Sequence, residues 1–378
     1  MMRCPRVLSN LLLAASTVVV SLLLVEVGLR VVGVSYPAFY RVDSKRGYGL
    51  RPYARGLYSR EGQSLVAINA AGFRGALPPL NPAGETLRIA VLGDSFTEGL
   101  QVEEQQTWIR ILEAQLNRSS SCPLLKGGQA ELLNFGVGGY GTGQALLTWR
   151  YQARAFQPAL VILAIYPGND FTDNQPGPRE DRPGFELRAD GALIQDNSFR
   201  DAAAFRFRTS PAGQLLDGLM NHSRLLQVLN EAKNRFSAMR RQSQVMTPPS
   251  LSVAPAPTPE ASSEAWAMTE ALVNQLAMEV RAAGARLLVI STTTPDQVWP
   301  EEEERPAVPF RQEQQLAKLL TVAGIPYRSL GPEMQLAVDQ NPKLLLHGFP
   351  DGEPGHGHWN ATGHSLAALQ LAPWLCEQ

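Results

Sequence analysis

The most uniform hydrophobic stretch covers residues 7–25, which carry no charge and lie between Arg6 and Glu26. A helix rises about 1.5 Å per residue, so a run of this length matches the roughly 30 Å hydrocarbon core of a bilayer. Arg3 and Arg6 precede the run, and the positive-inside rule keeps such an N-terminus in the cytoplasm. We predict a single-pass signal anchor in the cytoplasmic membrane, with the rest of the chain periplasmic or on the cell surface. The alternative is a cleaved signal peptide, but no small-x-small cleavage site ends the run.

From residue 85 onward, short apolar runs alternate with amphipathic stretches. The apolar runs predict strands at residues 87–92, 131–135, 159–166, 286–292 and 325–329. The amphipathic stretches predict helices at residues 104–117, 142–156, 264–283, 311–323 and 361–375. This alternation favours an α/β fold with a parallel sheet, helices on both faces and right-handed crossovers. Ligands of such sheets bind beyond the carboxyl ends of the strands.

Two segments depart from this alternation. Residues 33–84 are rich in Gly, Pro, Tyr and Arg and predict strands and turns that lie on the domain. Residues 171–264 are charged and contain prolines, with a helical stretch at 214–239 and a Pro/Ser/Thr-rich tract at 247–263. We interpret them as an insertion, ending in a flexible linker, within a catalytic domain over residues 85–378.

The composition is that of an ordinary globular protein with an α/β core of good size. The chain has 378 residues, of which 44% are hydrophobic and 18% charged, and its formal net charge is −1. No basic stripe interleaved with aromatic residues appears, so we expect no nucleic-acid partner.

Cysteine is rare, with Cys4 on the cytoplasmic side of the predicted anchor and Cys122 and Cys376 beyond it. An extracytoplasmic compartment permits a disulfide between the latter two, which the expected fold places near the same end of neighbouring helices. Two unrelated buried thiols are the alternative.

The first segment with candidate chemistry is Gly93-Asp-Ser-Phe-Thr-Glu-Gly99, between the first core strand and a helix. A serine at such a turn lies near a helix N-terminus, where backbone N–H groups and the helix dipole favour developing negative charge. Ser95 is therefore a candidate nucleophile, with a simple helix cap as the alternative. The segment is not the G-x-S-x-G elbow, so it does not indicate a classical α/β-hydrolase.

Two further segments follow the next two strands. In Asn134-Phe-Gly-Val-Gly-Gly139, successive glycines let backbone amides approach a ligand, and the Gly139 N–H is a candidate oxyanion donor. A phosphate loop is disfavoured because no Lys follows in the G-x-x-x-x-G-K pattern. In Gly168-Asn-Asp170, the Asn169 amide is a second candidate donor, and an Asn/Asp turn is the alternative.

A histidine-rich segment, His356-Gly-His358-Trp-Asn-Ala-Thr-Gly-His364, precedes the last predicted helix. An imidazole with a pKa near neutrality suits both taking a proton from a serine and returning it. We predict His358 as this base, and a packing or capping role for His364.

Together the four segments resemble, in order and in position at the strand ends, the sequence blocks of the SGNH (GDSL) hydrolase superfamily. The match covers about residues 87–172 and roughly the final 30 residues. The resemblance implies a flavodoxin-like three-layer α/β/α sandwich, a nucleophile at Ser95 and a base at His358. It also implies oxyanion donors from the N–H groups of Ser95 and Gly139 and the side chain of Asn169, with no metal or other cofactor required.

One feature departs from the family pattern. The triad acid normally lies two or three residues before the histidine, but Gly355 and His356 stand there in this chain. Asp351 and Glu353 are the nearest carboxylates upstream. We predict that Asp351 folds back to orient His358; the alternative is a Ser–His dyad whose histidine is held by a backbone carbonyl.

These features predict hydrolysis of short acyl esters, for example acetyl groups on an envelope glycan, through an acyl-enzyme on Ser95. The same acyl-enzyme also serves an O-acyltransferase, in which a sugar hydroxyl of an envelope polysaccharide replaces water. A non-catalytic binding module is a further alternative. Another is a metal site built from His347, Asp351, His356, His358 and His364, which the four-block match disfavours.

Overall fold

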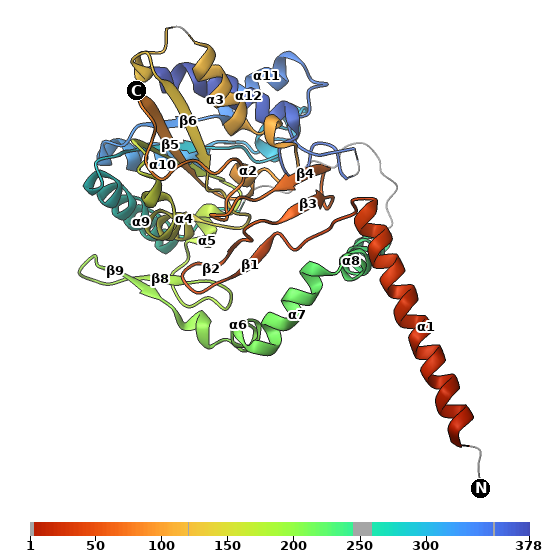
Figure 1. The fold of residues 1–378 in the computed structure, drawn as a ribbon. Coiled ribbons are helices and arrows are strands. Elements are labelled where there is room, and N and C mark those ends of the chain that lie inside the picture. The colour runs from red at the N-terminus through yellow and green to blue at the C-terminus, as the bar shows by residue number, and fades with distance from the viewer. Residues whose placement is uncertain (1–3, 120, 245–258, 351) are drawn as a thin grey trace.

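The computed structural model describes residues 4–119, 121–244, 259–350 and 352–378. A five-stranded parallel sheet lies at the centre of the α/β core (Figure 1). Its strand order is β11-β10-β7-β5-β6. Its strands are β5 (Thr86–Leu92), β6 (Gln129–Asn134), β7 (Leu160–Ile165), β10 (Arg286–Ser291) and β11 (Tyr327–Ser329). The predicted α/β fold with a parallel sheet is therefore confirmed.

Helices cover both faces of the sheet. One face carries α4 (Thr142–Tyr151), α9 (Ser263–Ala282) and α10 (Arg311–Ala323). The other face carries α3 (Trp108–Arg118), α11 (Gly331–Gln340) and α12 (Ala361–Cys376). Short helices α2 (Ser95–Glu98) and α5 (Asp170–Asp173) follow β5 and β7. The three layers match those of the sandwich expected from the sequence.

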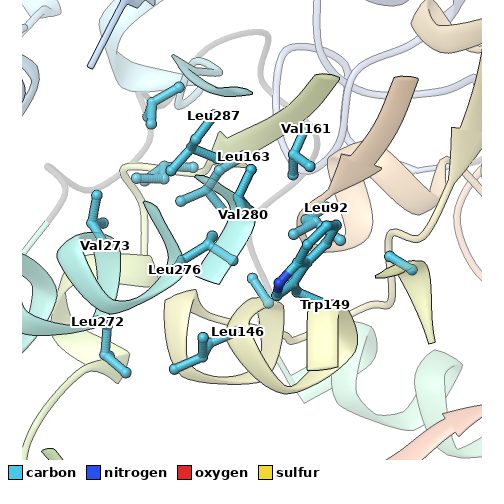
Figure 2. Packing of buried hydrophobic residues seen from close by; sticks show 14 of the residues in the cluster. Leu92, Leu146, Trp149, Val161, Leu163, Leu272, Val273, Leu276, Val280 and Leu287 are labelled. Atoms are coloured by element: carbon cyan, nitrogen blue, oxygen red, sulfur yellow. The ribbon is translucent and has the colours of Figure 1, made fainter. Parts of the chain in front are cut away.

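The sheet is held by alternation along its strands, since successive side chains point to opposite faces. Leu163 of β7 packs on the α4–α9 face, whereas the adjacent Ile162 packs on the α3–α12 face. Figure 2 shows the first of these interfaces, formed by Leu92, Leu146, Trp149, Val161, Leu163, Leu272, Val273, Leu276, Val280 and Leu287. β7 is buried along its whole length, which explains its unbroken apolar sequence.

Residues 33–84 form two antiparallel hairpins that pack on the core. The first pairs β1 (Tyr40–Asp43) with β2 (Gly47–Leu50), and the second pairs β3 (Arg55–Tyr58) with β4 (Ser64–Ala67). Buried Arg74 joins this segment to the loop after α2, because its guanidinium donates to the carbonyls of Gly99 and Val102.

The segment predicted as an insertion contains a hairpin and three helices. The hairpin pairs β8 (Gly184–Leu187) with β9 (Leu193–Asp196), and the helices are α6 (Ala203–Thr209), α7 (Pro211–His222) and α8 (Arg224–Gln244). The single helix expected at 214–239 is in fact two, because Ser223 has an extended backbone between them. Most of the expected linker, residues 247–258, lies outside the described residues, and α9 begins at Ser263.

Helix α1 (Cys4–Val31) projects away from the α/β core (Figure 1). Its part from Leu8 to Val31 is long and apolar enough to cross a membrane, although a signal sequence also meets this description. The carboxylate of Glu26 accepts hydrogen bonds from the backbone N–H groups of Arg224 and Leu225, at the start of α8. The end of α1 is therefore bonded to the corner between α7 and α8.

Cys122 and Cys376 form a disulfide that links the segment after α3 to the end of α12. The two helices pack side by side through the same apolar cluster, in which Leu112, Leu116, Leu371 and Leu375 are fully buried. The bond closes a loop of chain that contains most of the core, because the two cysteines are 254 residues apart in the sequence.

Candidate active site

Ser95 is the first residue of α2, directly beyond the carboxyl end of β5. The N-cap of this helix is Asp94, whose carboxylate accepts a hydrogen bond from the Phe96 N–H at 2.9 Å. Because Asp94 makes the capping bond, the Ser95 hydroxyl remains available to another partner. The close turn requires Gly93, since a Cβ there would overlap the Thr97 hydroxyl. Ser95 is thus held at the sheet edge as the sequence predicts.

His358 is the partner of the Ser95 hydroxyl. Its Nε2 lies 2.8 Å from Ser95 Oγ, which is hydrogen-bonding distance. The His358 carbonyl accepts a hydrogen bond from the Gly348 N–H. This bond joins two parts of the loop between α11 and α12. A serine and an imidazole that are 263 residues apart in the sequence therefore meet in the geometry of a nucleophile and a general base.

Glu61 occupies the other side of the imidazole. Its Oε2 lies 2.5 Å from His358 Nδ1, and its Oε1 accepts a hydrogen bond from the His358 N–H at 2.7 Å. Glu61 lies in the turn between β3 and β4, far from the histidine in sequence. Asp351, the acid predicted from the sequence, lies outside the described residues. Among the described residues, Glu61 is the carboxylate that contacts His358, and it occupies the position at Nδ1 that the dyad alternative gives to a backbone carbonyl.

Two glycines allow this approach. Gly62 has a φ of +63° in the turn that carries Glu61, and Gly357 has a φ of +73° directly before the histidine. Positive φ values of this size strain residues that carry a side chain. In addition, a Cβ on Gly357 would overlap Glu61 Oε1. The site therefore depends on a close contact between two loops.

Glu61 and His358 shift each other's pKa in opposite directions. Burial alone would lower the pKa of His358, but the hydrogen bond and the charge of Glu61 outweigh burial and raise it above 6.5. Burial alone would raise the pKa of Glu61, but the hydrogen bond and the charge of His358 hold it below its usual value. The pair thus favours a carboxylate beside an imidazolium, the charge state that forms after the histidine takes a proton.

The candidate oxyanion donors lie around the same open pocket, which has a volume of about 280 Å³. Ser95, Gly139, Asn169 and His358 all line it. Gly139 has a φ of +74°, and its carbonyl accepts a hydrogen bond from the Arg182 guanidinium. The Asn169 amide donates to Asp173 Oδ2 at 2.8 Å, a contact that fixes the orientation of the amide. The structure thus brings together every described residue that the sequence analysis assigned to catalysis.

Comparison with known families decides the classification. A model of the GDSL-like lipase/acylhydrolase family matches residues 91–366 of the chain. The chain belongs to this family. As a member of the GDSL-like lipase/acylhydrolase family, it is an ester-bond hydrolase with an SGNH-type α/β fold.

Solved structures with a similar chain path are distant in sequence. The acetyl xylan esterase AlAXEase is 11% identical with a TM-score of 0.41, over 76% of this chain and 99% of that one. An acetylxylan esterase from Geobacillus stearothermophilus is 10% identical with a TM-score of 0.39, over 76% and 92%. A protein described as a putative GDSL-like lipase from Parabacteroides merdae is 12% identical with a TM-score of 0.39, over 78% of this chain and 99% of that one. No curated protein matches the chain.

The remaining histidines of this acylhydrolase are bound by other protein groups. His347 contacts the Gly357 carbonyl through Nδ1, at 2.8 Å, and the Thr293 hydroxyl through Nε2, at 3.1 Å. His364 Nδ1 accepts a hydrogen bond from the Trp108 N–H, which is a packing role of the kind predicted. Burial lowers the pKa of both histidines to about 3. Both ring nitrogens of His347 and Nδ1 of His364 thus contact groups of the protein itself.

Two buried carboxylates lie behind the site. Asp94 caps α2, and burial raises its pKa to about 6. Asp170 accepts a hydrogen bond from the Tyr166 N–H at 2.9 Å, and burial together with the charge of Asp94 raises its pKa well above the usual value. They stabilise the loops after β5 and β7, which hold Ser95 and Asn169.

Glu61 is the one residue of this arrangement that the sequence analysis did not assign. The sequence indicated such a residue only indirectly. No carboxylate stands two or three residues before His358, so the acid had to come from another part of the chain. An acidic residue next to a glycine, in a turn between two extended stretches, is a reasonable place to look for the missing group. Only the packing of the hairpin on the core identifies it.

Proposed function

We propose that the protein is a serine esterase that hydrolyses short acyl esters through an acyl-enzyme on Ser95. The observation that carries the proposal is the continuous contact from Ser95 Oγ to His358 Nε2 and from His358 Nδ1 to Glu61 Oε2, at 2.8 Å and 2.5 Å. This is the arrangement of nucleophile, base and orienting acid found in hydrolytic triads. Glu61, and not Asp351, is the acid in this proposal.

In the first half of the reaction, Ser95 Oγ attacks the acyl carbon while its proton passes to His358 Nε2. The negative charge that develops on the carbonyl oxygen is stabilised by the N–H groups of Ser95 and Gly139 and the amide of Asn169. The bond between the acyl carbon and the alcohol oxygen then breaks. The departing alcohol takes the proton from His358, and the acyl group remains on Ser95.

In the second half, water attacks the acyl-enzyme and gives a proton to His358. The bond to Ser95 Oγ breaks, the proton returns to the serine, and the carboxylic acid leaves. Glu61 holds the imidazole so that Nε2 faces the serine, and its charge stabilises the imidazolium in both halves. Each half of the reaction therefore uses the same residues in the same positions.

The pocket favours a small acyl group. Its volume of about 280 Å³ is at the lower end of the range for ligand sites, and its walls include the polar groups that surround Ser95. This size supports acetyl or other short esters, including acylated glycans, as substrates. An O-acyltransferase would form the same acyl-enzyme and pass the acyl group to a sugar hydroxyl in place of water.

Turnover of p-nitrophenyl acetate, butyrate and octanoate by the full chain tests the proposal. We expect the acetate or the butyrate to be hydrolysed with the highest kcat/KM, and a fluorophosphonate probe to label Ser95. Absence of both hydrolysis and labelling would overturn the proposal. In single-turnover experiments with a sugar acceptor, preferential transfer of the acyl group to the sugar would replace hydrolysis by transfer as the principal reaction.

We also propose that α1 anchors the enzyme in the cytoplasmic membrane, with the α/β domain outside. The apolar surface of α1 supports this topology, and so does the disulfide between Cys122 and Cys376, because such bonds persist in oxidising compartments. Mass spectrometry of the membrane fraction tests whether α1 is retained. Protease added to sealed, right-side-out vesicles should remove a tag placed after Gln378; a protected tag would contradict the topology.

A further inference from the structure

Helix α7 presents its apolar side outward and its polar side to the protein. Asp217 forms an ion pair with Arg51 at 2.7 Å, and Asn221 Oδ1 accepts a hydrogen bond from the Ala38 N–H at 3.0 Å. On the opposite side of the helix, Leu215 and Leu219 are 66% and 53% exposed. A surface helix in water shows the reverse pattern, with its apolar stripe toward the core.

The outward apolar side of α7 is continuous with α1. A groove of about 750 Å³ separates the two helices. Its apolar walls include Val19, Leu22 and Leu23 of α1, Leu215 and Leu219 of α7, and Leu225 and Leu226 of α8. Glu26 and Arg30 of α1, and His222 at the end of α7, form its polar end. The apolar surface of the two helices is therefore shared and not two separate patches.

The position of the groove along α1 determines the depth at which α7 lies relative to the two ends of α1. Val19 is seven residues before Glu26, and a helix rises about 1.5 Å per residue, so Val19 lies about 10 Å below the polar end of the groove. If α1 crosses the membrane, this stretch lies within one leaflet. Helices that lie in a bilayer surface bury their apolar side by about 5–10 Å, which agrees with the level of Leu215 and Leu219.

Helix α6 adds cations at the same surface. Phe207 is 54% exposed and lies between Arg206 and Arg208, which are also exposed. Apolar residues flanked by arginines are typical of helices at the boundary between acyl chains and phosphate head groups.

We propose that α6 and α7 form a second membrane contact, in which the outer side of α7 lies among the acyl chains of the leaflet that adjoins the α/β domain. This inference rests on the proposed insertion of α1. With two contacts in place of one, the catalytic domain is fixed in its orientation above the bilayer, because a single membrane-spanning helix would leave the domain free to tilt. Lipid hydrocarbon is the occupant of the groove.

The test uses single-cysteine variants of the full chain, reconstituted in phosphatidylcholine–phosphatidylglycerol vesicles. The background variant is Cys4→Ser, since the other two cysteines form the disulfide. An environment-sensitive fluorophore is attached at Leu216→Cys on the exposed side of α7, 51% exposed in the wild type. Val322→Cys on α10, where the wild-type side chain is 89% exposed, provides the water-exposed control, and Leu12→Cys in α1 reports the anchor.

We expect lipid-borne nitroxides to quench the label at position 216 severalfold more strongly than the label at position 322, and aqueous iodide to quench them in the reverse order. If the label at position 12 is quenched by lipid but the label at position 216 only by iodide, the inference fails while the anchor stands. If position 216 is shielded from iodide only when several copies share a vesicle, and not in nanodiscs that hold one copy, a second copy is the occupant and the inference fails. Esterase activity of the same samples reports on the proposed function independently.

Discussion

The sheet edge and the β3–β4 hairpin contribute to the candidate site in different ways. Ser95, Gly139 and Asn169 follow successive strands of one sheet, so the fold brings them together without any further requirement. Glu61 belongs to a small hairpin that must pack on the core before it reaches His358. Residues of the first kind are predictable from short motifs, whereas the residue of the second kind depends on a tertiary contact. Substitutions in each group test whether the two kinds of residue contribute in different ways to the reaction.

The largest effect is expected for the nucleophile at the sheet edge. Ser95→Ala removes the atom that forms the acyl-enzyme, so kcat should fall by about 10⁴-fold or more. The measurement is steady-state hydrolysis of p-nitrophenyl acetate. Ser198→Ala, which alters an exposed serine bonded only to Asp196, should retain full activity. Residual turnover above about one per cent in Ser95→Ala would remove Ser95 from the mechanism.

The hairpin residue comes next. Glu61→Gln keeps the size of the side chain but removes its charge and favours the wrong tautomer of His358, so kcat should fall by about 10³-fold. Asp351→Asn is the matched comparison, since Asp351 is the acid predicted from the sequence. We expect it to retain activity. The opposite result, with a large loss in Asp351→Asn and little loss in Glu61→Gln, would restore Asp351 as the acid and separate the hairpin from catalysis.

A donor at the sheet edge is expected to contribute less than either. Asn169→Ala removes one of the three proposed oxyanion donors and should lower kcat by about 10²-fold with little change in KM, because such a donor acts on charge that develops in the transition state. Asp173→Asn, which alters only the group that orients the Asn169 amide, should give a smaller loss. A rise in KM without a loss of kcat would assign Asn169 to substrate binding instead.

The contact between the β3–β4 hairpin and the loop before α12 is tested by a change in that loop. Gly357→Ala would place a Cβ against Glu61 Oε1 and would strain a residue with a φ of +73°, so activity should fall by about 10-fold as the carboxylate is displaced. Gly352→Ala is the control in the same segment, since its Cβ would meet nothing closer than 3.8 Å. Equal activities in the two variants would show that Glu61 tolerates displacement.

The smallest expected effect is a shift in pH dependence. His358 must be neutral to accept a proton, and Glu61 raises its pKa, so kcat/KM of the wild type should decline as the pH falls through a value above 6.5. In Glu61→Gln the raising contribution is lost, so the residual activity should persist to a lower pH than in the wild type. If the decline of kcat/KM at low pH were unchanged in Glu61→Gln, Glu61 would not interact with the imidazole of His358.

Much of the fold was predictable because local pattern and tertiary structure agree. The amphipathic stretch at 311–323 is α10 to the residue, and the apolar run at 286–292 is β10 to within one residue. The helix expected at 214–239 was wrong in continuity, because a one-residue break at Ser223 leaves no mark in a hydrophobic pattern. Helix α11 was missed because it follows β11 after the single residue Leu330, which leaves no turn segment to separate strand and helix in the sequence.

The candidate site divides in the same way. The positions of Ser95, Gly139, Asn169 and His358 follow from motifs at the ends of predicted elements. The partner of His358 Nδ1 does not, because Glu61 is 297 residues away in the sequence and no short-range pattern records the pairing of a hairpin turn with a distant loop. The disulfide was only partly predictable from the sequence. The expected helix arrangement placed Cys122 and Cys376 near each other, but left free thiols as an alternative.

The position of Glu61 has a practical consequence for the boundaries of the catalytic unit. The family match begins at residue 91, and the first strand of the sheet begins at Thr86, so a recombinant fragment cut at either point would keep Ser95 and His358. Such a fragment would nevertheless lack its carboxylate. If Glu61 is the acid as proposed, the smallest competent enzyme starts upstream of β3, and a screen for active relatives that discards sequences without an acid beside the histidine would discard this one.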